Sequence, residues 1–258
     1  MAKGKQRQKI RKTVLYIFVL LFPIVYYYLS PYLVITGASE GIVTGSLVVF
    51  SLMLFTSLFL GRAFCGWVCP AGGEQDLCSK LREGRFRHGK LNVIKYIIWL
   101  PWVSIIGLMF FRAGGIKSLD FLYQTYYGVS IQNVPSLVLF SIIAGIIALL
   151  ALSVGKRGFC HLGCWMAPFM IIGRKLSNLL KFPALRLRAY AGECIECKAC
   201  TDNCPMSLDV MEMVRQGYME DSECILCGTC VDICPGSAIK YSFSVARIEK
   251  PSTGPVNS

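Results

Sequence analysis

The residues best suited to chemistry in this chain are its 13 cysteines, eight of which fall in two short runs in the last third of the sequence. Each run has the form C-x2-C-x2-C-x3-C-P, the spacing with which thiolates hold [4Fe–4S] clusters. The two runs comprise Cys194, Cys197, Cys200 and Cys204, and then Cys224, Cys227, Cys230 and Cys234. The sequence therefore predicts two iron–sulfur clusters, and with them one-electron redox chemistry.

In each run, three closely spaced cysteines can bind three irons of a cube, and the fourth ligand must come from elsewhere. In proteins with two such runs, it is the last cysteine of the other run. We therefore predict that cluster 1 is held by Cys194, Cys197, Cys200 and Cys234. We predict that cluster 2 is held by Cys224, Cys227, Cys230 and Cys204. Zinc sites are the alternative, but they usually combine two separated pairs of cysteines.

A second cysteine pattern occurs twice earlier in the chain, as RAFCGWVCP at residues 62–70 and RGFCHLGC at residues 157–164. One C-x3-C pair supplies too few thiolates for a cluster, whereas two pairs together supply four. The four are Cys65, Cys69, Cys160 and Cys164. They could hold a third iron–sulfur cluster, either [4Fe–4S] or [2Fe–2S]. The sequence favours this over a four-cysteine zinc site or free and redox-paired thiols.

Two further residues lie near these pairs, and no motif assigns them a role. Cys78 has no counterpart in the second copy, and we expect a buried free thiol on a short helix opened by Pro70. A role as a substitute ligand is the alternative. His161, beside Cys160, could tune or ligate a cluster, but a histidine in such a place more often only forms a hydrogen bond. We assign no catalytic residue.

These cysteines lie in a chain that is too apolar for a soluble protein. Of its 258 residues, 54% are hydrophobic and only 16% are charged, and long apolar runs recur. We predict four membrane-spanning helices, at residues 14–36, 41–61, 92–111 and 135–155. The basic start is followed by no small-residue cleavage site, so we expect a retained anchor rather than a signal peptide.

The net charge of +12 is distributed along the flanks of the apolar runs. Lys and Arg gather in residues 1–12, 62–95 and 156–188, which indicates membrane topology rather than a nucleic-acid patch. The positive-inside bias predicts a multi-pass protein of the cytoplasmic membrane, with both termini and the middle loop in the cytosol. Lys95 is the one charged side chain within the predicted spans, and we expect it to snorkel to the cytosolic surface.

The membrane half repeats itself, because each C-x3-C pair follows a predicted span. SLVVF at residues 46–50 opens the second span, and SLVLF at residues 136–140 opens the fourth. Both copies run from outside to inside, so they would form parallel repeats about an axis along the membrane normal. Such a repeat would bring the two cysteine pairs together at the cytosolic face.

The fold class predicted is an α-helical membrane domain with a parallel two-fold repeat, followed by a small α+β ferredoxin domain with two clusters. The segments are a basic cytosolic tail at 1–13, a four-helix membrane domain at 14–165, an interfacial helix or linker at 166–183, the ferredoxin domain at 184–246 and a disordered tail at 247–258. Alternating residues predict antiparallel strands at 184–190 and 238–244, and residues 207–217 suit a helix.

With these motifs placed, the chain resembles membrane-bound 4Fe–4S ferredoxin-type electron-transfer proteins. Examples are the quinol-oxidising subunit of periplasmic nitrate reductase systems and the membrane and ferredoxin part of the nitrous-oxide reductase activator. The likeness rests on the four apolar runs, the paired C-x3-C segments and the eight-cysteine region. Two departures are that Cys164 is not followed directly by proline and that the flavin-binding domain of the activator is absent. A quinone as redox partner is implied by this resemblance alone.

We expect a membrane-anchored protein that passes single electrons between a cytosolic partner, such as a soluble ferredoxin or reductase, and a quinone or a membrane subunit. It could serve as the electron-transfer subunit of a quinol dehydrogenase. The alternative is a redox-sensing or maturation factor that supplies electrons to an assembling metalloenzyme. We expect neither haem nor flavin, and no nucleic-acid partner. Every cysteine lies in a segment predicted to be cytosolic, so electrons could not cross the membrane on this chain's metals alone.

Overall fold

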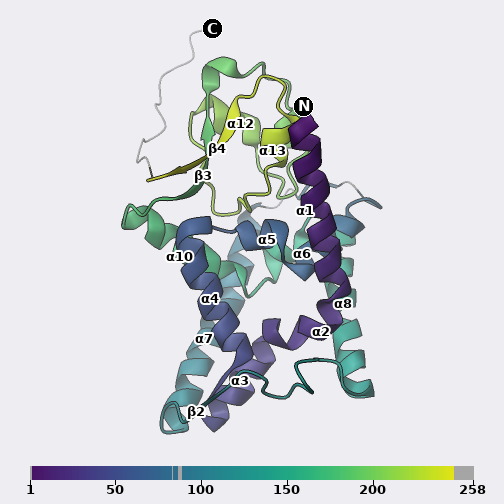
Figure 1. Cartoon of the computed structure of the whole chain (residues 1–258), viewed down its shortest axis with the longest axis vertical. Helices are drawn as coiled ribbons and strands as arrows, with labels where there is room; N and C mark the ends of the chain where they lie inside the picture. The colour runs from purple at the N-terminus through teal and green to yellow at the C-terminus, as the bar shows by residue number, and fades with distance from the viewer. Residues whose placement is uncertain (1, 83, 87–88, 247–258) are drawn as a thin grey trace.

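The structure is a computed structural model that describes residues 2–82, 84–86 and 89–246. The predicted disordered tail at 247–258 lies outside the described residues. The molecule is elongated, with long helices at one end and, at the other, the segment at residues 184–246, which we call the cysteine-rich domain (Figure 1). Its buried apolar side chains form one continuous cluster that runs from the helices into the cysteine-rich domain.

The first predicted span is broken rather than continuous. The chain forms α1 (Ala2–Leu20), α2 (Phe22–Val25), the 3-10 helix η1 (Tyr26–Leu29) and α3 (Pro31–Glu40). The axis bends by 59° between residues 4–20 and 22–29. Pro23 and Pro31 lack the N–H that a continuous helix needs, and Ser30 adopts the extended backbone favoured before proline. The helix predicted over residues 14–36 is therefore interrupted near both prolines, and its crossing of a membrane stays a prediction.

The basic residues at the start of the chain are helical. Because α1 begins at Ala2, the predicted boundary between a tail at 1–13 and a span from residue 14 is not a structural break. The basic half of α1 packs beside helix α13 (Thr229–Ile233) of the cysteine-rich domain. The first helix therefore runs from the cysteine-rich domain down among the other helices (Figure 1).

Three further apolar helices match the remaining predicted spans in position. They are α4 (Gly45–Leu60), α7 (Ile94–Arg112), which follows η2 (Gly89–Val93), and α8 (Val134–Val154). In the described part of the chain, two helices are long and apolar enough to cross a membrane, at 89–112 and 134–154, and a third is added if the bent pair counts as one span. Helix α4 is apolar but shorter. The four-span count thus stays a prediction.

Short helices follow the two long helices that precede the C-x3-C pairs. After α4 come α5 (Ala63–Trp67) and α6 (Pro70–Cys78), and after α8 come α9 (Gly158–Leu162) and α10 (Ala167–Leu179). The packing is crossed, since α10 lies on α4 while α6 lies on α8. A Cβ on Gly173 of α10 would lie 1.8 Å from Ser57 Oγ, so only glycine allows this approach. Reciprocal packing supports the predicted parallel repeat, which itself remains a prediction.

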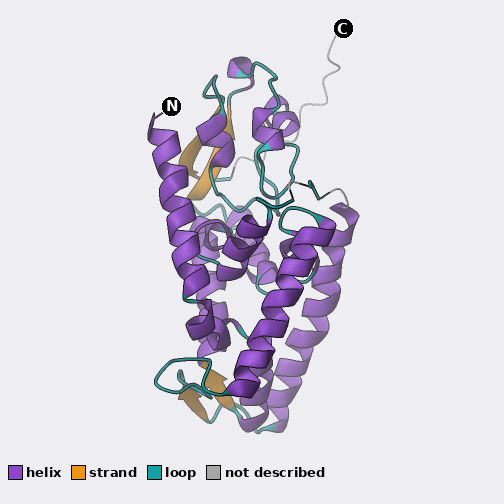
Figure 2. Cartoon of the chain, turned by 90° about the vertical axis from the view of Figure 1, so that its right-hand side faces the viewer, coloured by secondary structure: helices purple, strands orange, loops and turns teal. Residues whose placement is uncertain are grey.

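A pair of short strands lies at each end of the molecule (Figure 2). At the end far from the cysteines, β1 (Ile42–Thr44) pairs in parallel with β2 (Ser118–Asp120), which the sequence did not predict. In the cysteine-rich domain, β3 (Ala184–Ala189) pairs with β4 (Ile239–Ser244) in antiparallel register, which confirms the predicted pairing. The remaining elements there are η3 (Ala191–Glu193), α11 (Ala199–Asp202) and α12 (Val210–Arg215). The predicted helix at 207–217 contains α12.

Candidate iron–sulfur sites

The four cysteines predicted to hold cluster 2 surround one small cavity. They are Cys204, Cys224, Cys227 and Cys230, and apolar side chains complete the lining. Burial raises the pKa of Cys224 to about 12 and that of Cys204 to about 11. Buried thiols of this kind need a positive charge to become thiolates, and iron supplies one. The donor set and its surroundings therefore fit a cluster.

The four cysteines predicted to hold cluster 1 line a second cavity. They are Cys194, Cys197, Cys200 and Cys234. This site lies nearer to solvent, because Cys197 is exposed and Cys194 and Cys234 are half-buried. The adjoining Ile195 is 66% exposed. The two cavities group the eight cysteines as the sequence predicted, and the ligand assignment itself remains a prediction.

The two cysteine runs have the same local backbone. Left-handed residues occur at equivalent places in both, as Glu196 and Lys198 in the first and as Leu226 and Gly228 in the second. Such conformations cost about 1–3 kcal/mol in non-glycine residues, so the loops are held by their surroundings. A Cβ on Gly228 would lie 2.5 Å from the Tyr241 hydroxyl, so this position requires glycine. Tight loops of this shape keep three thiols close together.

The C-x3-C pairs, far apart in sequence, meet in the structure. Their four thiols belong to Cys65, Cys69, Cys160 and Cys164, each of which is at most 5% exposed. Burial, followed by the nearby Cys160 and Cys65, raises the pKa of Cys164 to about 12. Among the residues that the structure describes, no three His, Cys, Asp or Glu side chains are placed to hold a single metal ion. We call the four thiols the membrane-side site.

Each first cysteine of a pair touches the helix that follows the other pair. Gln75 on α6 donates from Nε2 to Cys160 Sγ at 3.2 Å, and its Oε1 accepts from the Phe159 N–H at 3.0 Å. Met170 on α10 places its sulfur 3.9 Å from Cys65 Sγ. When the two C-x3-C motifs are aligned, these two residues fall opposite each other. Neither residue was predicted from the sequence, although the alignment of the two copies places them opposite each other.

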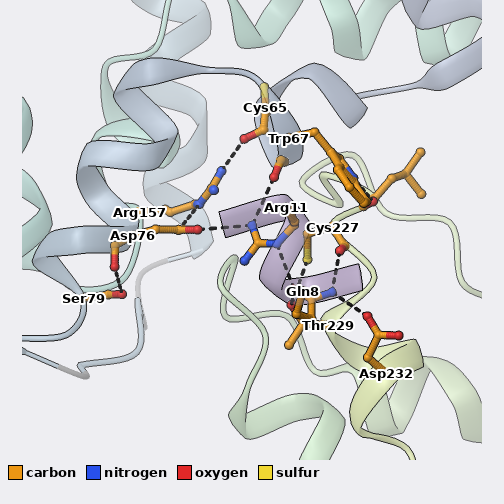
Figure 3. A network of polar contacts seen from close by, with 12 residues as sticks. Gln8, Arg11, Cys65, Trp67, Asp76, Ser79, Arg157, Cys227, Thr229 and Asp232 are labelled. Carbon is orange, nitrogen blue, oxygen red and sulfur yellow. Dashed lines mark hydrogen bonds and ion pairs between the residues drawn. The ribbon is translucent and has the colours of Figure 1, made fainter. Parts of the chain in front are cut away.

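A partly buried carboxylate between two buried cations ties the two motif segments together. Asp76 accepts from Arg157 Nε at 3.0 Å and from Arg11 Nη1 at 3.2 Å. Arg157 also donates to the Cys65 carbonyl at 2.7 Å (Figure 3). Burial alone would raise the pKa of Asp76, but the two guanidinium groups outweigh it and lower the pKa. The arginine of the second motif thereby fixes the backbone of the first.

A second such group joins the first motif to the cysteine-rich domain. Glu223, directly before Cys224, accepts from Arg62 Nη1 at 2.9 Å and from Lys95 Nζ at 2.5 Å. Burial acts to raise the pKa of Glu223, and Arg62 with Lys95 lowers it overall. The Lys95 side chain is 0% exposed, so the expectation that it snorkels to the surface is wrong. Its charge is used to hold Glu223.

The first C-x3-C segment packs directly on the loop of cluster 2. A Cβ on Gly66 would lie 2.4 Å from the Ile225 carbonyl oxygen, and Trp67 Nε1 donates to the Leu226 carbonyl at 3.1 Å. Helix α1 contacts both of these segments. Arg11 donates to the Gly66 carbonyl and Gln8 donates to the Cys227 carbonyl, both at 3.1 Å (Figure 3). The membrane-side site and cluster 2 are therefore neighbours.

The two remaining candidates stay outside the grouped thiols. Cys78 lies on the short helix that opens at Pro70, as predicted, but it is half-buried rather than buried. His161 is buried and forms a 2.7 Å contact from Nδ1 to Asn92 Oδ1. Its ring stacks on Phe86 at 4.2 Å, and burial lowers its pKa to about 4. The hydrogen-bonding role expected for His161 is what the structure contains.

Two family models of iron–sulfur domains match segments of this chain that contain candidate ligand cysteines. A family model described as a 4Fe-4S binding domain matches residues 42–89, and one described as a 4Fe-4S dicluster domain matches residues 193–239. The first match includes the first C-x3-C pair, and the second includes both cysteine runs. The second match confirms the predicted 4Fe–4S ferredoxin-type character of the cysteine runs, and the two matches support two iron–sulfur clusters. No solved structure matches the chain.

Several curated proteins are similar over most of the chain. The uncharacterized protein MJ0750 of Methanocaldococcus jannaschii is 28% identical over 70% of this chain and 73% of its own length. The putative electron transport protein YccM of Escherichia coli is 25% identical over 71% of this chain, which spans 52% of that protein. The methylamine utilization ferredoxin-type protein MauN of Methylorubrum extorquens is 26% identical, over 68% and 59% respectively.

Proposed function

We propose that this chain, which carries 4Fe–4S domains of the ferredoxin type and resembles iron–sulfur electron-transport proteins, is a membrane-anchored electron carrier with three clusters in series. Cluster 1 would lie at the tip, cluster 2 in the middle and a third cluster at the membrane-side site. The observation that carries the proposal is the packing of the Gly66 backbone against the Ile225 carbonyl, which leaves no room for even a methyl group between these two cysteine-bearing segments.

The residues that would hold the third cluster are the four thiols of the membrane-side site. The match of residues 42–89 to a 4Fe-4S binding domain supports this, because that stretch contains Cys65 and Cys69. When bound, such clusters take up and release one electron at a time. Burial of all four thiols excludes water from the site, and Arg62 and Arg157 offset negative charge beside it.

The thiols of the candidate sites also differ in how deeply they are buried. The membrane-side thiols are the most deeply buried, whereas Cys197 of cluster 1 is exposed beside Ile195. Exchange with a soluble partner is therefore expected at cluster 1. Exchange with a quinone or a membrane subunit is expected near the membrane-side site, where the apolar helices begin. The printed name of YccM, a putative electron transport protein, is in keeping with such a role.

The orientation follows from charge. Basic residues of α1, of the segment after α4 and of the segment after α8 all lie at the end of the molecule that carries the cysteines. The positive-inside rule places that end in the cytosol. The exposed apolar faces of α7 and α8, which include Ile97, Leu100, Ile142 and Leu149, would then face lipid. We infer a multi-pass protein of the cytoplasmic membrane.

The proposal is tested by counting iron and acid-labile sulfide in protein purified without oxygen, together with electron paramagnetic resonance (EPR). Three [4Fe–4S] clusters would give about twelve irons per chain, and two with a [2Fe–2S] site would give about ten. Neighbouring reduced clusters should also broaden one another's EPR signals. A value of about eight irons would reject the third cluster while leaving the other two. Colourless protein without sulfide would reject the whole proposal.

A further inference from the structure

A polar cavity of about 260 Å³ lies beside the iron–sulfur sites without being part of them. Its walls come from α1, from α6, from the turn between α8 and α9, and from the loops around cluster 2. Its charged lining residues are Lys12, Lys80, Lys156, Arg11, Arg157 and Asp76. The proposed electron transfer gives this cavity no role.

The cavity has a surplus of positive charge. Asp76 is the one carboxylate in its lining, and it is already bound by Arg11 and Arg157. In the described part of the chain, Lys12, Lys80 and Lys156 form no ion pair. The Lys80 ammonium lies over the Tyr16 ring at 4.8 Å, and the Lys156 ammonium donates only to the Asp202 carbonyl, at 3.5 Å. Three lysines from three separate elements thus converge without a counter-ion.

The position of the cavity along the helices indicates which anion would bind in it. Lys156 lies just after the last residue of α8, and Lys12 marks the point where α1 changes from basic to apolar. Both transitions are typical of the level of lipid headgroups. Basic pockets at this level between helices recognise phosphate-bearing headgroups. The cavity also offers the Ser79 hydroxyl and the Tyr16 ring for further contacts.

We propose that this cavity is a binding site for a phosphate group, supplied either by an anionic phospholipid headgroup or by a soluble phosphate compound. Pro205 and Thr229 also line the cavity, and they directly follow Cys204 and precede Cys230 of cluster 2. The Thr229 hydroxyl lies 3.5 Å from Cys227 Sγ. A bound phosphate would therefore place negative charge beside cluster 2 and lower its reduction potential.

Binding can be measured on the full holoprotein in detergent by native mass spectrometry with phosphatidylglycerol, with phosphatidylcholine and with inorganic phosphate. We expect one phosphatidylglycerol to be retained in preference to phosphatidylcholine. The triple variant Lys12→Gln, Lys80→Gln, Lys156→Gln should bind it about a hundredfold more weakly. The matched control Lys9→Gln, Lys90→Gln, Lys175→Gln removes the same charge outside the cavity and should bind as the wild type does.

Competition separates the two sources of phosphate. Loss of the lipid on adding millimolar inorganic phosphate would assign the site to soluble phosphates, and its retention would assign it to the headgroup. Unchanged iron content shows that a variant is folded, and the single variant Lys156→Gln replaces the triple one if iron is lost. The proposal is overturned if the wild type and the cavity variant retain both ligands equally, whatever the iron count shows about the clusters.

Discussion

The two C-x3-C segments have the same spacing but different surroundings. After Cys69 the chain enters α6 with Glu74, Gln75 and Asp76, whereas the aligned residues of α10 after Cys164 are Phe169, Met170 and Ile171. The preceding arginines also differ, because Arg62 reaches Glu223 of the cysteine-rich domain while Arg157 reaches Asp76 of the other copy. The two segments therefore share the spacing of their thiols but not the polar residues around them.

The two segments also differ in what the helices beside them pack against. The first copy carries the polar helix and faces the cluster 2 loop through Gly66 and Trp67. The second copy carries the amphipathic helix α10, which packs closely on α4 through Gly173 and pairs with Glu220 through Arg174. Two questions can be tested separately: whether the thiols of the two segments play the same part, and whether the residues around them differ in effect. Each test substitutes aligned residues of both segments.

The largest expected effect tests the equivalence of the thiols. Cys65→Ser and Cys160→Ser should each remove the third cluster and lower the iron content by about four per chain, or about two for a [2Fe–2S] site. The measurement is iron and sulfide analysis with EPR of anaerobically prepared protein. Cys78→Ser is the control and should leave the iron content unchanged, because Cys78 does not belong to the grouped thiols. Iron loss in only one of the first two variants would contradict the equivalence.

The next effect concerns the carboxylates that each lie between two buried cations. Glu223→Gln leaves Arg62 and Lys95 without a counter-ion, and Asp76→Asn does the same to Arg11 and Arg157. Leaving a buried charge unpaired costs about 3–5 kcal/mol, so both variants should unfold at clearly lower temperature. Glu223→Gln should in addition speed proteolysis of the cysteine-rich domain, because its contact with α7 is lost.

A matched surface variant sharpens this test. Glu196→Gln breaks an exposed pair with Arg215 at 3.5 Å, which is worth about 0–1 kcal/mol. If Glu223→Gln proved as mild as Glu196→Gln in the same thermal unfolding assay, the buried pair would not join the two regions. Because the pKa of Glu223 is lowered in the folded protein, its contribution is present at neutral pH and is lost as the pH falls through that lowered value.

Glu74 gives a pH-dependent test, because its counterpart in the second copy is the uncharged Phe169. Burial raises the pKa of Glu74 to about 7. Ionising it in the folded state is unfavourable, so its destabilising effect begins above the unfolded value of 4.5 and is fully developed above pH 7. Because the side chain is partly solvated, we expect Glu74→Gln to stabilise by about 1–2 kcal/mol at pH 8.

The measurement for Glu74 is the midpoint of thermal unfolding at pH 5 and at pH 8. The difference between the wild type and Glu74→Gln should be much smaller at pH 5, because the folded protein then holds Glu74 protonated and the pH is only slightly above the unfolded value of 4.5. Glu40→Gln, at the far end of α3, is the control and should follow the wild type at both values. A Glu74→Gln variant that is less stable than the wild type at pH 8 would mean that Glu74 is charged and paired.

The sequence could predict what depends on local pattern. Strand alternation gave the pairing of β3 with β4, and cysteine spacing gave the thiol groups that line the two cavities. It could not predict contacts between distant segments. Lys95 was expected at the surface because nothing near it in sequence indicates that Glu223 lies against it. Likewise, the basic residues of α1 look like a solvated tail until the loop of cluster 2 is placed beside Gln8 and Arg11.

The smallest expected effect compares the aligned residues Gln75 and Met170 directly. The Gln75 side chain donates a hydrogen bond to the sulfur of Cys160, whereas Met170 offers Cys65 only a thioether. A hydrogen bond to a ligand sulfur stabilises the more negative, reduced state and so raises the reduction potential. Gln75→Met should therefore lower the potential of the third cluster, and Met170→Gln should raise it. Redox titration followed by EPR measures both, and shifts of the same sign would show that packing, not hydrogen bonding, distinguishes the two copies.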